Sequence, residues 1–210
     1  RTTYRERYTV VGLFENRVYP GIRRLLRTLK REGWYIGIAT GKPQQTSERV
    51  GAHFGLDRFV DKLCGPTMGH KAEKVELISN ALPEGWNAET DDIWMVGDRK
   101  FDIEGAIGAG VKSVGVGYGY GSEDELRHAG CTAYCETVQD VIGFLCPGAK
   151  VPTGAFLSIE GLDGSGKGTQ IRLLTDAIDR FGFELVLSRE PGGCPISEKL
   201  RDIVLDKNNT

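Results

Sequence analysis

Apolar positions along the chain alternate between helix-like and strand-like patterns. Leu25 and Leu29 lie on one helical stripe, which is expected to end at Gly33. Residues 34–40 (WYIGIAT) then form a short β-rich run. Alternation of this kind predicts an α/β fold, a parallel sheet with helices on both faces. It continues with helical patterns at 71–82, 102–110 and 137–145 and strand patterns at 92–98, 111–117 and 132–135.

The rhythm breaks near residue 147, where two prolines and two glycines occur within CPGAKVPTGA. Such a stretch is typical of a linker. A new series follows, with a strand at 155–161, a helix at 167–182 and a strand at 183–190. We therefore expect one domain over 1–146, a linker at 147–154 and a second α/β domain over 155–210.

Composition indicates ordinary globular material, with 40% hydrophobic and 27% charged residues and a formal net charge of -2. That charge gives no reason to expect nucleic acid or an acidic membrane as a partner. No apolar run approaches the roughly 20 residues that span a bilayer. The five cysteines contain no Cys-x-x-Cys pair, and the three histidines are scattered, which argues against a zinc site. A cytoplasmic protein with reduced thiols is the resulting expectation.

Candidate chemistry begins at two predicted strand ends, because ligands of open parallel sheets bind where strands end. Thr40 closes one strand, and Asp98 closes another. Asp102 follows Asp98 by about one helical turn, so both carboxylates could approach a hard cation such as Mg²⁺. The spacing alone is also explained by a solvated turn.

The order of the segments IATGKP, HKAEKVELI and MVGDRKFDIEGA resembles the second, third and fourth motifs of haloacid-dehalogenase-type phosphatases. GLFENRVYPGI and VGVGYGYGSEDELRHAG resemble the phosphoglycolate-phosphatase branch. The resemblance covers residues 4–145. It implies a Rossmann-like core that hydrolyses phosphoglycolate or a similar small phosphate ester with Mg²⁺.

Carried over to this sequence, the resemblance implies a role for each strand-end residue. Thr40 and Gly41 would hold the phosphate, and Asp98 would bind Mg²⁺ with support from Asp102. Lys71 would neutralise the phosphorylated nucleophile, and Lys74 is the alternative. Lys71 is preferred because it is expected to begin the helix at 71–82.

The family's nucleophile, the first Asp of an Asp-x-Asp motif on the first strand, has no counterpart here. Asp91 and Asp92 precede a strand rather than end it. The domain is therefore expected to lack its first strand and cap. Either the natural protein is longer or it is a degenerate relative, and residues 4–20, which resemble the exit from the cap, favour the longer protein.

The second series contains the segment GLDGSGKGTQ at 161–170, which fulfils most of the pattern G-x-x-x-x-G-K-[ST]. It follows a predicted strand and begins a helix, so backbone N–H groups can converge on phosphate oxygens beside Lys167. Gly168 stands where a Mg²⁺-binding hydroxyl is usual, and Thr169 comes one place later. Metal ligation by Thr169 is therefore left open.

FLSIEGLDGSGKGTQ together with LSREPGGCPISEKLRDIVLD resembles the beginning of a thymidylate kinase. That resemblance implies the first βαβ unit of a P-loop kinase, which moves the γ-phosphate of ATP to dTMP. Lys167 would contact the transferred group, and Asp163, Glu190 and Arg201 would lie at the dTMP side. The ATP loop would comprise Gly161, Leu162, Asp163, Gly164, Ser165, Gly166, Lys167, Gly168 and Thr169.

A bifunctional phosphatase and thymidylate kinase is the leading interpretation, with ATP, dTMP and a phosphate ester as substrates. The resemblance also implies a homodimer through the kinase segment. In one alternative the first domain is a non-catalytic binding or assembly module. In another, the kinase prefers a different nucleoside monophosphate.

Overall fold

The computed structural model describes residues 7–8, 11–69, 71–150, 156–160, 165–180, 183, 185–188, 196, 199 and 202–203. The chain divides into two units, unit 1 with residues 1–157 and unit 2 with residues 158–210. The domain and linker bounds expected from the sequence remain predictions. Each unit is considered by itself.

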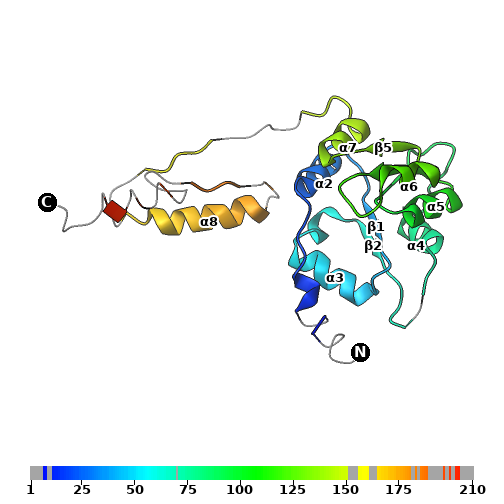
Figure 1. Ribbon diagram of the computed structural model, residues 1–210, viewed down its shortest axis with the longest axis horizontal. Coiled ribbons are helices and arrows are strands. Elements are labelled where there is room, and N and C mark those ends of the chain that lie inside the picture. Colours follow the sequence, from blue (N-terminus) through cyan, green and yellow to red (C-terminus); the bar gives the residue numbers. More distant parts are fainter. Residues whose placement is uncertain are drawn as a thin grey trace. The chain divides into compact units, whose positions relative to one another are not determined.

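Unit 1 has the α/β architecture that the sequence predicts (Figure 1). Its described strands form two parallel sheets, β1–β2 and β3–β4–β5. The strands are β1 (Gly37–Ala39), β2 (Lys62–Cys64), β3 (Trp94–Gly97), β4 (Lys112–Val116) and β5 (Ala133–Cys135). The helices are α2 (Ile22–Arg31), α3 (Gln44–His53), α4 (Lys74–Ala81), α5 (Lys100–Gly108), α6 (Glu123–His128) and α7 (Val138–Leu145), with 3-10 turns η1 (Gly12–Phe14) and η2 (Asp57–Phe59).

Helices cover both faces of the larger sheet because side chains alternate along its strands. Trp94 and Val96 pack into the core formed with α2 and α7. Ile93 and Met95 pack into the opposite core, formed with α4 and α5. Val114 of β4, paired with Val96, is fully buried. The sheet is therefore the middle of three layers, with helices over both of its faces.

Helix α4 begins later than the sequence pattern suggests. The expected helix at 71–82 starts at Lys74 and ends at Ala81. Glu73 has an extended backbone (φ -69°, ψ 149°) and is the N-cap residue. Lys71 therefore lies before the helix, and the expectation that it begins the helix is wrong.

In unit 2, helix α8 (Lys167–Arg180) confirms the helix expected at 167–182 as far as Arg180, and residues 181–182 lie outside the described residues. Residues 156–160 and 185–188 belong to the two expected flanking strands, yet they form no strand. Phe156 and Val186 are more than nine-tenths exposed. Apolar side chains of this size are usually buried in a completed sheet, and neither of these two described segments belongs to one. None of the described helices is long and apolar enough to span a membrane.

Candidate functional site

The residues that follow β1 and β3 form the centre of the candidate site in unit 1. Thr40 comes directly after β1, and its backbone N–H donates to the carbonyl of Cys64 at 2.9 Å, extending the pairing with β2. The Thr40 hydroxyl oxygen Oγ1 accepts from the backbone N–H of Lys42 at 3.2 Å. Gly41 is exposed between them. A hydroxyl and a sharp turn thus stand at the carboxyl end of this strand.

Lys74 connects the two strand ends. Its ammonium Nζ donates to the carbonyl oxygen of Ala39, the last residue of β1, at 2.9 Å. The same atom lies 2.7 Å from Oδ1 of Asp102 on α5, and both side chains are at least three-quarters buried. Lys71, by contrast, is exposed before α4. The structure therefore brings Lys74, the alternative in the sequence, to the strand ends, whereas Lys71 lies outside this ion pair.

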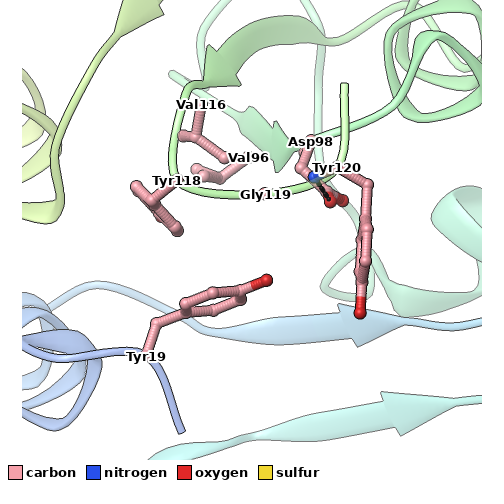
Figure 2. A pocket seen from close by; sticks show the side chains of 8 residues that line it. Tyr19, Val96, Asp98, Val116, Tyr118, Gly119 and Tyr120 are labelled. Carbon is pink, nitrogen blue, oxygen red and sulfur yellow. Dashed lines mark hydrogen bonds between the residues drawn. The ribbon is translucent and has the colours of Figure 1, made fainter. Parts of the chain in front are cut away.

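Asp98, at the end of β3, is held by the loop that follows β4. The backbone N–H of Tyr120 donates to Oδ2 of Asp98 at 2.8 Å (Figure 2), and that of Gly121 donates to the Asp98 carbonyl at 2.9 Å. A Cβ atom at Gly119 would collide with the Asp98 side chain, and one at Gly121 with its carbonyl oxygen. Glycine is therefore required at both positions for the loop to approach this closely.

Asp102 caps its own helix rather than facing outward. Its Oδ2 accepts from the backbone N–H of Arg99 at 3.1 Å, while Oδ1 faces Lys74. A Cβ atom at Gly97 would collide with the Asp102 side chain, so the end of β3 packs directly on the first turn of α5. Both Asp102 oxygens are thereby used within the protein.

The described residues do not form a complete Mg²⁺ site. No group of three His, Cys, Asp or Glu side chains among them is placed to hold a metal ion. Asp98 Oδ1 accepts no hydrogen bond from another described residue, whereas both oxygens of Asp102 have partners. Of the expected pair of carboxylates, Asp98 thus keeps one oxygen without a described partner, whereas each Asp102 oxygen already holds a partner within the protein.

A pocket of about 300 Å³ adjoins Asp98 (Figure 2). The rings of Tyr19 and Tyr118 meet edge-on with centroids 5.5 Å apart. Burial raises the pKa of Tyr118 to about 12, so its phenol stays neutral at physiological pH. The lining residues are Tyr19, Val96, Gly97, Asp98, Val116, Tyr118, Gly119 and Tyr120.

In unit 2, the described part of the glycine-rich loop leads directly into a helix. Gly166 has φ +82°, a left-handed conformation that favours glycine, and α8 begins at Lys167. Gly168 and Thr169 are exposed in the first turn, and Ser165 is exposed before it. The remaining expected loop and acceptor residues lie outside the described residues: Gly161, Leu162, Asp163, Gly164, Glu190 and Arg201.

Comparison with known proteins assigns the two parts of the chain to different families. Residues 2–116 match the haloacid dehalogenase-like hydrolases, and residues 159–210 match thymidylate kinase. The first match covers more than half of the chain, so the protein belongs to the haloacid dehalogenase-like hydrolase family. A segment related to thymidylate kinase follows this domain, as the sequence predicts.

Individual relatives agree with this division. The chain is 45% identical over 134 residues to a 5'-nucleotidase of Pseudomonas aeruginosa, covering 63% of this chain and 60% of that protein. It is 51% identical over 57 residues to a thymidylate kinase of Pelobacter propionicus, covering 27% and 26% of the two chains. The crystal structure of a putative phosphatase from Clostridium difficile superposes with a TM-score of 0.63 at 33% identity, covering 69% of this chain and 67% of that one.

Sequence reasoning passed over the aromatic pocket. Tyr118 and Tyr120 lie in GYGYGS, which the sequence suggests to be an ordinary turn after a strand. The available signal was the position of that turn, because the end of β4 adjoins the end of β3 in a parallel pair. No pattern in the sequence links Tyr19 to this place.

Proposed function

We propose that unit 1 is the core of a phosphatase that hydrolyses a small phosphate ester at the ends of β1 and β3. The observation that carries this proposal is the position of Lys74, which joins the carbonyl of Ala39 to the carboxylate of Asp102. A cation fixed at the strand end that Thr40 follows is suited to neutralising a phosphoryl group.

Each residue has a distinct task in this proposal. Thr40 donates its hydroxyl proton to a phosphate oxygen, and the exposed N–H of Gly41 adds a second donor. Lys74 neutralises negative charge on the phosphoryl group, and the buried Asp102 keeps the ammonium oriented. We assign this role to Lys74 rather than Lys71, because Lys71 is exposed before the helix.

The nucleophile is proposed to come from a further parallel strand seated between β1 and β3. In the part of the chain that the structure describes, β1 pairs only with β2, and β3 only with β4. Each thus has an edge without a partner, and a strand there would end beside Lys74. An aspartate at that end, as the family resemblance implies, would face the ammonium.

Mg²⁺ belongs to the proposal only through Asp98, whose Oδ1 can serve as one oxygen ligand. The remaining oxygens would have to come from water, the substrate and the proposed strand, since Mg²⁺ commonly keeps several waters. When bound, the ion would neutralise charge on the phosphate.

The substrate is proposed to be phosphoglycolate or another small ester, with nucleoside 5'-monophosphates as the second candidate. The tyrosine-lined pocket beside Asp98 favours the second, because aromatic rings stack on nucleobases. The similarity to a 5'-nucleotidase points the same way.

A binding experiment tests the site without requiring turnover. Inorganic phosphate is titrated into the 210-residue protein, and the backbone amide signals of Thr40 and Gly41 are followed by NMR. Lys74→Met is expected to weaken binding about tenfold, since a charge-assisted contact is lost, while Lys71→Met leaves it unchanged. Equal binding by both variants, or a loss with Lys71→Met alone, contradicts the assignment.

Hydrolysis of phosphoglycolate or of nucleoside monophosphates is then measured with Mg²⁺. A synthetic peptide that ends in Asp-x-Asp is added to supply the proposed strand. Turnover with this strand and none with its Asn-x-Asn counterpart supports the nucleophile strand. Phosphate binding without turnover under any of these conditions instead favours the alternative, a binding module.

For unit 2 we propose a contribution to an ATP:dTMP phosphotransferase. Gly166 in a left-handed conformation directly before α8 supports a phosphate-binding loop at this helix N-terminus. Addition of ATP is expected to shift the amide signals of Ser165, Gly166 and Gly168, and Lys167→Met is expected to abolish the shifts. Transfer from ATP is then compared for dTMP, AMP, CMP, GMP and UMP, and a preference for any of the last four contradicts the acceptor assignment.

A further inference from the structure

Glu125 on α6 accepts hydrogen bonds from the turn between β3 and α5. Its Oε1 accepts from the backbone N–H of Lys100 at 3.0 Å and from the guanidinium Nε of Arg99, also at 3.0 Å. These two donors lower the pKa of the Glu125 carboxyl, the backbone N–H of Lys100 being the larger influence. The acceptor is therefore charged throughout the neutral range.

The grip by Glu125 continues a series of contacts between two segments of the chain. Asp98 accepts hydrogen bonds from the backbone N–H groups of Tyr120 and Gly121. Two residues later, the backbone N–H of Lys100 donates to Glu125. Ser122 caps α6 by accepting from the backbone N–H of Glu125, so the backbone of Glu125 is held in the first turn of the helix. The segments 98–100 and 120–125 are thus joined at four consecutive hydrogen bonds.

We propose that Glu125 is a positioning residue for Asp98, holding the first turn of α5 so that the carboxylate keeps one direction at the strand ends. It acts as an acceptor of two hydrogen bonds and is not among the residues that line the pocket. The role of Asp98 as a ligand at the phosphate site rests on the proposed phosphatase function, but its positioning by Glu125 does not.

Two other roles for Glu125 can be distinguished from positioning. A purely electrostatic role would need the charge of Glu125 but not its hydrogen-bond geometry. A purely structural role for α6 would make any disrupted ion pair on that helix equivalent. Glu123 offers the comparison on the same helix, since it pairs with Arg127 at 2.7 Å; this pair is more exposed (57% and 49%) than that of Arg99 and Glu125 (45% and 28%).

The test compares Glu125→Ala, Glu125→Gln and Glu123→Ala in the 210-residue protein. Hydrogen exchange of the Lys100, Tyr120 and Gly121 amides is measured by NMR under native conditions. Glu125→Ala is expected to accelerate exchange at all three amides about tenfold, since a charged acceptor is lost and local opening becomes easier. Glu125→Gln, which keeps the acceptor oxygen, is expected to restore most of the protection, and Glu123→Ala to leave it unchanged.

Four outcomes overturn the proposal: unchanged exchange at Tyr120 and Gly121 in Glu125→Ala, equal acceleration by Glu123→Ala, no rescue by Glu125→Gln, or acceleration spread evenly over α6. If Glu125→Ala does not fold, the comparison of Glu125→Gln with Glu123→Ala decides: protection as in the wild type supports the acceptor role, and loss in Glu125→Gln refutes it. Phosphate binding is followed in the same samples. Confirmed exchange changes without phosphate binding by the wild-type protein would refute the phosphatase while leaving the positioning role intact.

Discussion

The ends of β1 and β3 differ in how tightly the surrounding chain holds them. Asp98 at the end of β3 accepts backbone hydrogen bonds from Tyr120 and Gly121 on a loop that glycines allow to approach closely. Thr40 at the end of β1 accepts one side-chain hydrogen bond, from its near neighbour Lys42, and Gly41 has open space around it. The Asp98 carboxylate is therefore held by a second loop, whereas the Thr40 hydroxyl is held from within its own turn, where the Lys42 carbonyl accepts from the Ser47 hydroxyl.

Such a division suits a phosphoryl site. A preorganised carboxylate needs little reorganisation when charge develops, whereas the exposed positions of Gly41 and Lys42 leave room beside Thr40 for esters of different shape. Lys74 contacts both regions, through the carbonyl of Ala39 at the end of β1 and the carboxylate of Asp102 beside the end of β3.

The largest effect is expected for Gly119→Ala, which tests the close packing of the loop on Asp98. The added methyl group would overlap the Asp98 side chain, so the free energy of unfolding should fall by about 3 kcal/mol. Urea denaturation measures this value. Gly143→Ala on α7, where nothing lies within 4 Å of the added atom, should be neutral or slightly stabilising. Equal effects of the two substitutions would show that the loop around Asp98 is not tightly packed.

Lys74→Met removes the connection between the two ends. A mostly buried Asp102 loses its cation, which should cost about 2 kcal/mol of unfolding free energy. Lys71→Met, at an exposed position, should change it by less than about 0.5 kcal/mol. Chemical denaturation of both variants decides, and a larger loss for Lys71→Met would reverse our assignment.

The pH dependence of the unfolding free energy compares the two sheets through one carboxylate beside each, Asp61 near β2 and Asp92 near β3. Asp61 accepts from Lys30 at 2.7 Å and from the backbone N–H of Ile36 at 2.7 Å, and these hydrogen bonds lower its pKa, the one from Lys30 most. Asp61→Asn should cost about 1 kcal/mol at pH 7. Because the pKa is lowered on folding, the stabilisation is present above the unfolded value of about 3.9 and is lost as pH falls through the lower folded value.

The control for Asp61 is Asp92→Asn beside β3, whose ion pair with Lys112 is more than half exposed on both sides. Its effect should stay below about 0.5 kcal/mol. Unfolding curves recorded from pH 7 down through the acid range should therefore show gaps that close at low pH for both variants, since Lys112 also lowers the pKa of Asp92, with the larger gap at pH 7 for Asp61→Asn. A pH-independent gap for that variant would show that its carboxylate is not the source of the difference.

The smallest effect is expected for Thr40→Val. The single hydrogen bond from Lys42 is lost at a half-buried position, so the free energy of unfolding should fall by only about 0.5 kcal/mol. Phosphate affinity, measured by the same NMR titration, should nevertheless drop, because the hydroxyl is the proposed donor. Unchanged affinity would remove Thr40 from the site.

Periodicity predicted the layered fold of unit 1 well, since Trp94 and Val96 on one face and Ile93 and Met95 on the other follow a simple alternation. It could not place the start of α4, where Lys71 and Lys74 belong to one helical pattern and only backbone geometry at Glu73 separates them. The capping of α5 by Asp102 was equally hidden, because G-D-x-x-x-D spacing suits a metal pair and a capping residue alike. Glu125 was missed since its partners lie 25 and 26 positions away.

The close packing of Gly97, Gly119 and Gly121 against two aspartates limits how this protein can be altered. A library that randomises the turn after β1 can retain the fold with many side chains, whereas one that randomises these glycines will yield mostly unfolded clones. An engineer seeking a new ester specificity should therefore begin at Gly41 and Lys42 and leave the opposite rim untouched.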